Sequence, residues 1–114
     1  MNTKIYKQVH TLATNLLKAA QKDDDETFTK LYDELKAICE EHEHTEKNHP
    51  VQWETLADFT EESDDALVIY EKALSFAKKI ESHDFLASIN FAMAVIFHES
   101  GKNEDDTKYD ANTN

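Results

Sequence analysis

The uncharged stretch FLASINFAMAVIF, residues 85–97, decides how the rest of this chain must fold. Its polar side chains are Ser88 and Asn90. At helical spacing, Leu86 and its neighbours lie on one face, and Phe91 and Val95 lie on the other. A helix that is apolar all round is usually buried, and this one is shorter than the roughly 20 residues that cross a bilayer. We therefore expect protein, from this chain or from another, to cover both sides of it.

The composition predicts an all-α fold. The chain has 114 residues, which suits a single domain, and it contains one glycine and one proline. Strand-rich folds need several turns with positive φ, which glycine usually supplies. We therefore expect stacked antiparallel helical hairpins, about five helices, over residues 1–101. The segment 102–114 is polar and acidic, and its composition predicts a disordered tail.

The charge of the chain excludes some classes of partner. Its formal net charge is −12, from 24 acidic and 12 basic residues. Nucleic acids and anionic membranes would be repelled, because such binding depends on lysine and arginine. A basic protein partner would be attracted, although solubility alone also accounts for an acidic surface. No secretory signal or membrane span is evident, so a cytoplasmic location is the expectation, and the single Cys39 forms no internal disulfide.

Apolar residues at helical spacing place the five helices. Asp23 and Glu26 resemble a capping box that starts the second helix, Pro50 suits the first turn of the third, and Gly101 suits the end of the fifth. The expected ranges are 3–22, 25–43, 51–61, about 63–80 and about 85–100.

Two parts of the chain repeat each other. Phe28, Tyr32 and Leu35 correspond to Ala66, Tyr70 and Ala73 at a constant offset of 38 residues. The pattern Trp53-x-x-Leu56-Ala57 corresponds to Asn90-x-x-Met93-Ala94 at an offset of 37 residues. A repeat of this length indicates helix pairs that stack to bury their apolar faces.

These patterns resemble the tetratricopeptide repeat family. The segment 66–74, ALVIYEKAL, is similar to the second helix of that repeat, and Met93-Ala94-x-x-Phe97-x-x-x-Gly101 is similar to the end of its first helix. The likeness is clear over residues 53–101, although the spacing exceeds the family's usual period of about 34 residues. An ordinary five-helix bundle is the alternative.

The resemblance implies a concave groove lined by the first helix of each pair. It would hold a peptide or protein segment, and its lining would come from three helices: His10, Ala13 and Leu17; Val51, Glu54, Asp58 and Glu61; Ser88, Phe91, Val95 and His98. The acidic residues suit a basic or amphipathic segment rather than a carboxyl-terminal peptide, which family members grip with lysines and asparagines. The residues expected to matter most for partner binding are Glu54, Asp58, Glu61, Phe91, Val95 and His98.

Chemistry at a metal or catalytic site is not expected. Cys39, His42, His44 and His49 are close in sequence, and zinc favours such ligands, but their spacing matches no established zinc motif. The thiol of Cys39 lies on an apolar stripe beside two glutamates, which disfavour a thiolate. No phosphate-binding glycine loop or catalytic carboxylate pair is evident. We therefore predict that the protein is not an enzyme and needs no cofactor or metal.

Three functions fit these observations. The first is a protein-binding module, an adaptor or chaperone that holds a segment in its groove. The second is an immunity protein or antitoxin that neutralises a basic, nuclease-type toxin by binding it. The third is a homodimer formed through the uncovered side of the fifth helix.

Overall fold

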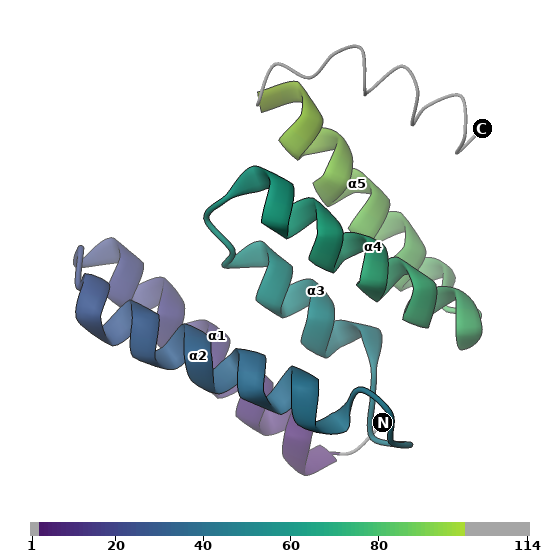
Figure 1. Cartoon of the computed structure of the whole chain (residues 1–114), viewed down its shortest axis with the longest axis horizontal. Helices are drawn as coiled ribbons and strands as arrows, with labels where there is room; N and C mark the ends of the chain where they lie inside the picture. The colour runs from purple at the N-terminus through teal and green to yellow at the C-terminus, as the bar shows by residue number, and fades with distance from the viewer. Residues whose placement is uncertain (1–2, 100–114) are drawn as a thin grey trace.

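The computed structural model describes residues 3–99 and shows that this part of the chain is all-helical (Figure 1). The predicted tail 102–114 and the predicted cap at Gly101 lie outside the described residues. The described residues form five helices: α1 (Thr3–Gln21), α2 (Asp25–His42), α3 (Pro50–Asp58), α4 (Ser63–Lys79) and α5 (His83–Glu99).

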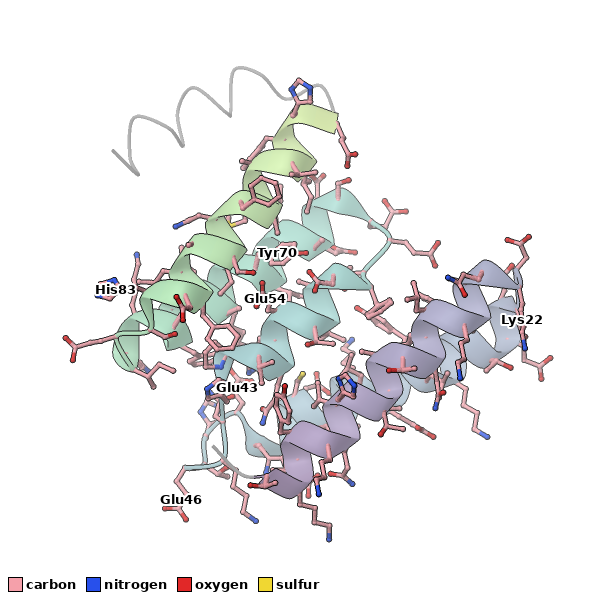
Figure 2. All side chains as sticks on the ribbon, turned by 180° about the vertical axis from the view of Figure 1, so that it is seen from behind. Lys22, Glu43, Glu46, Glu54, Tyr70 and His83 are labelled. Atoms are coloured by element: carbon pink, nitrogen blue, oxygen red, sulfur yellow. The ribbon has the colours of Figure 1, made fainter. Side chains whose placement is uncertain are left out.

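Consecutive helices form antiparallel hairpins around the central helix α3. This helix packs against each of the other four, whereas α1 packs on α2 and α3, and α5 packs on α3 and α4. Seen from behind, α1 lies over α2 and α5 lies over α4, with α3 between them (Figure 2). Within residues 3–99, α5 is therefore covered by α3 and α4 and does not pack against α1.

The two tightest turns use the same backbone motif without glycine. Asp23 and Glu81 have positive φ values of 55° and 53°. In each turn the following amide reaches back five residues: Asp24 N–H donates to Ala19 C=O at 2.9 Å, and Ser82 N–H donates to Ala77 C=O at 3.0 Å. This is the Schellman arrangement that usually ends a helix with glycine. It explains how a chain with so little glycine turns sharply twice.

The capping prediction for α2 is wrong by one residue. Asp24, rather than Asp23, is the N-cap, and its Oδ1 accepts a hydrogen bond from Thr27 N–H at 3.2 Å. Asp23 instead occupies the left-handed position that ends α1. The acidic run 23–25 contains suitable capping residues at each position, so the pattern placed the turn correctly but not the cap.

The helix α3 is shorter than predicted. Pro50 stands in its first turn, as expected, and His49 caps it by accepting a hydrogen bond from Val51 N–H on Nδ1 at 3.1 Å. The helix ends at Asp58 rather than near residue 61. Beyond it, Thr60 donates through Oγ1 to Leu56 C=O at 2.8 Å and lies 2.7 Å from the Tyr32 hydroxyl, which fixes the exit of the chain against α2.

The core runs through all five helices. Its fully buried apolar members include Leu16 on α1, Leu35 on α2, Leu56 on α3 and Ile89 on α5. In α3, Gln52, Trp53, Leu56 and Ala57 are all buried, together with Pro50. In the longer and more apolar α5, the buried residues are Ile89, Met93 and Phe97.

Candidate functional site

One side of α5 is uncovered by the rest of the described chain. Phe91 is 73% exposed, the largest value among the exposed large apolar residues. Its neighbours on the same side of the helix are exposed as well: Ala87, Asn90, Ala94 and His98. Within residues 3–99, the expected cover of both sides of this helix is therefore present on one side only.

The carboxylate of Glu54 links α3 to α5 beside this uncovered side. Ser88 on α5 donates through Oγ to Glu54 Oε2 at 2.5 Å. One turn further along α3, Asp58 Oδ1 accepts a hydrogen bond from the hydroxyl of Tyr70 on α4. The labelled side chains of Glu54 and Tyr70 lie near each other where α3, α4 and α5 meet (Figure 2). Each carboxylate therefore has one fixed donor from a neighbouring helix.

Partial burial changes the acidity of both carboxyl groups. Burial raises the pKa of Glu54 above its ordinary value of 4.5, against the opposing effect of the Ser88 hydrogen bond, and the charge of Asp58 raises it further. Burial likewise raises the pKa of Asp58 above 3.8, although the Tyr70 hydrogen bond opposes it. The ionised forms are thus less well solvated than ordinary surface carboxylates, and a nearby cation would stabilise them.

The helix α1 presents exposed apolar residues on the side turned away from α2. Lys4 and Gln8 line a hollow shared with α2, so residues across the helix, at 6, 10 and 17, face away from it. Tyr6 is 44% exposed and Leu17 is 53% exposed. The rings of Tyr6 and His10 stack with their centroids 6.5 Å apart.

These residues define what we call the α1–α3–α5 face. Its members are Tyr6 and Leu17 on α1, Glu54 and Asp58 on α3, and Ser88 and Phe91 on α5. Of the five exposed large apolar residues in the described part of the chain, three belong to it, and the remaining two, Val68 and Ile80, belong to the α4 region. The face thus combines exposed apolar groups on its outer helices with partly buried carboxylates on its central helix.

The other predicted groove residues occupy different environments. Val95 is half-buried, and His98 is exposed in the last turn of α5. Glu61 lies beyond the end of α3, where it lines a hollow with Phe28 of α2 and Asp65 of α4. Ala13 and Val51 are half-buried.

Sequence reasoning did not select Tyr6 for this face, nor Tyr70 of α4 as the partner of Asp58. Tyr6 lies four residues before the predicted His10, so the same helical spacing would have included it. Tyr70 was identified as a repeat position, but its hydroxyl bond to Asp58 depends on how α4 packs on α3.

Two of the residues considered as metal ligands, Cys39 and His49, contact different partners. The Cys39 thiol is buried and donates to Gln52 C=O at 3.2 Å, and burial raises its pKa to about 12. His49 caps α3, and its ring lies edge-on to Phe85 at 5.2 Å. Within residues 3–99, no group of three or more His, Cys, Asp or Glu side chains is arranged to hold a metal ion.

The helix α5 has 17 residues, fewer than the roughly 20 that cross a bilayer. None of the helices in the described part of the chain combines the length with the apolar character that a membrane span needs.

Comparison of the sequence and the structure with family models, curated proteins and solved structures found no match.

Proposed function

We propose that this protein is a non-catalytic protein-binding module whose α1–α3–α5 face holds a basic, amphipathic segment of a partner. The observation that carries the proposal is that Phe91, an aromatic residue on an apolar helix, is 73% exposed. Large aromatic side chains that are exposed beside polar groups are typical anchors of protein interfaces. Leu17 and Tyr6, at 53% and 44% exposure, provide further apolar contact on α1.

The carboxylates of the face favour a basic partner. Glu54 and Asp58 lie on consecutive turns of α3, and burial raises the pKa of both. An ammonium or guanidinium group placed between them would compensate the solvation that their ionised forms have lost. The net charge of −12 would also speed the encounter with a positively charged partner.

The likeness to tetratricopeptide repeats supports the same choice of face. In that family the first helices of successive pairs bind the ligand, and the corresponding helices here are α1, α3 and α5. The adaptor or chaperone role follows from this likeness. The antitoxin role uses the same face against a basic toxin, and the homodimer through α5 uses Phe91 against a second copy.

Binding of a defined probe tests the proposal. The probe is a fluorescently labelled helical peptide with leucines on one face of the helix and lysines on the other. The readout is fluorescence anisotropy. We expect Phe91→Asp to weaken binding by about tenfold or more, as for loss of an interface anchor. The matched control is Val68→Asp, because Val68 is also an exposed apolar residue, at 65%, but lies on α4.

A second pair of variants separates charge from apolar contact. Glu54→Lys should weaken peptide binding strongly, whereas Glu40→Lys, which changes the net charge equally at an exposed position on α2, should have a small effect. Equal losses for Glu54→Lys and Glu40→Lys would mean that the net charge, and not the position of Glu54, attracts the peptide. Equal losses for Phe91→Asp and Val68→Asp would remove the α1–α3–α5 face from the proposal.

A further inference from the structure

The outer side of the α1–α2 hairpin carries an apolar hollow that the proposed function does not use. Its volume is about 650 Å³, and its lining includes Lys4, Lys7, Leu12, Glu34, Ala37 and Ile38. On the opposite side of α2, Tyr32 meets Thr60 and Cys39 meets Gln52, so that side faces α3. The hollow therefore lies at the free end of the helical stack.

Charge of opposite sign marks the two ends of this hollow. In an antiparallel hairpin that turns near residue 23, Lys4 lies about eight residues further from the turn than Glu34 does. At about 1.5 Å per residue, the two charges are offset by roughly 12 Å along the hairpin. Ala37 and Ile38 lie between these levels. Neither Lys4 nor Lys7 has an ion-pair partner within residues 3–99.

We propose that this surface binds a second copy of the chain. A two-fold axis that lies in the surface, perpendicular to the line from the lysines to Glu34, exchanges the two ends. Each copy's Lys4 and Lys7 would then meet the other copy's Glu34, while the two apolar centres meet each other. A self-complementary pattern of this kind is what a two-fold interface requires.

The proposed interface depends on contacts between individual charged residues and not on the net charge of the chain. Two copies of a chain with net charge −12 repel each other at long range. At physiological ionic strength the Debye length is about 8 Å, so distant acidic groups are largely screened while contacting pairs are not. Short-range contact of Lys4 and Lys7 with the other copy's Glu34 therefore stabilises the dimer despite the net charge.

Sedimentation of the full chain over a wide concentration range provides the test. Lys7→Glu and Glu34→Lys should each raise the dimer dissociation constant by about tenfold or more, because the first creates two like-charge contacts per dimer and the second creates four. The double variant Lys7→Glu/Glu34→Lys should bind itself more tightly than Glu34→Lys alone, because the exchanged charges at positions 7 and 34 again meet their opposites while Lys4 stays opposite a like charge. Ala37→Glu should also weaken it while leaving the thermal stability unchanged, since Ala37 is exposed.

Long-range repulsion and the proposed contacts predict opposite effects for one variant. Glu34→Lys changes the net charge from −12 to −10, which by repulsion alone would strengthen the dimer, whereas the proposed contacts weaken it. Glu40→Lys carries the same change at another exposed position of α2 and serves as the control. A monomer at every concentration would overturn the inference. So would a dimer that Glu34→Lys leaves intact, or one that is lost in Phe91→Asp but not in Lys7→Glu.

Discussion

The helices α3 and α5 show opposite relations between composition and burial. The nine-residue helix α3 contains a glutamate and an aspartate, yet it packs against all four other helices. Within residues 3–99, the seventeen-residue helix α5 is more apolar but packs against α3 and α4 alone, with Phe91 left 73% exposed.

Position in the stack accounts for this difference. Trp53 and Ala57 on α3 are buried, with Phe76 of α4 against the indole at 5.8 Å. The corresponding positions on α5 at the 37-residue offset, Asn90 and Ala94, are exposed. A helix in the middle of a stack is covered from both directions, whereas a helix at the end has one side that its neighbours do not reach. Apolar residues on such a side are candidates for contact with a partner.

The largest expected effect contrasts a core residue of α3 with the exposed aromatic of α5. Leu56 is 1% exposed, so Leu56→Ala should lower the free energy of unfolding by about 2–5 kcal/mol through lost contacts and a cavity. Phe91→Ala should change it by less than about 0.5 kcal/mol, because the ring is mostly in solvent. Urea unfolding followed by circular dichroism measures both. A loss of similar size for Phe91→Ala would mean that α5 is covered after all.

A smaller effect on the free energy of unfolding is expected for Lys72 of α4, which lies over the indole of Trp53 on α3. The Lys72 ammonium lies 4.5 Å from the Trp53 ring centroid and 2.7 Å from Glu43 Oε2. Lys72→Met keeps much of the side-chain volume but removes both interactions, so we expect a loss of about 1 kcal/mol. The tryptophan fluorescence of the folded state should also change. Lys78→Met, at an exposed position of the same helix, should leave stability and fluorescence unaltered.

The partial burial of Glu54, between α3 and α5, predicts that stability depends on pH. Because burial raises the pKa of Glu54 in the folded protein, folding binds protons, and stability falls as the pH rises from about 4.5 through the raised pKa. Glu54→Gln keeps an acceptor for Ser88 but removes this titration.

Unfolding measurements at a series of pH values test this sign. The Gln variant should gain stability relative to the parent protein as the pH increases to about 7, by less than the loss for Lys72→Met. Glu40→Gln should follow the parent protein. A Gln variant that loses stability with rising pH, relative to the parent, would contradict the assigned burial of Glu54.

The smallest effect concerns the turn that leads into α5. Glu81 has a φ of 53°, which is costly for a residue with a Cβ and easy for glycine. Glu81→Gly should therefore raise stability by a few tenths of a kcal/mol, once the flexibility that glycine adds to the unfolded chain is included. Glu71→Gly, within α4, should instead lower stability, and thermal unfolding distinguishes the two. A loss in Glu81→Gly would show that the turn has another conformation.

Much of the fold was predictable from local patterns. Helical spacing and the scarcity of glycine predicted an all-α chain of five helices, and Pro50 marked the start of α3. The end of α3 was not predictable, because Thr60 binds Tyr32 across the stack, at 2.7 Å, rather than continuing the helix. The cap of α2 was misplaced because neighbouring aspartates have equal capping ability.

The candidate site was predictable to a lesser degree. The resemblance to tetratricopeptide repeats selected Glu54, Asp58 and Phe91, but sequence alone could not show that Ser88 and Tyr70 would bond the two carboxylates. Nor could it show that Glu61 would lie beyond α3, beside α2. Those relations depend on how neighbouring helices are rotated against each other, which local periodicity leaves undetermined.

The most direct test of the central claim is a chemical-shift map of the labelled protein during titration with the basic amphipathic peptide. We predict that the largest shifts fall at Leu17, Glu54 and Phe91, on the α1–α3–α5 face, and that the amide of Val68 on α4 stays unchanged. Shifts centred on α2 or on the outer side of α4, with Glu54 and Phe91 unaffected, would contradict the account.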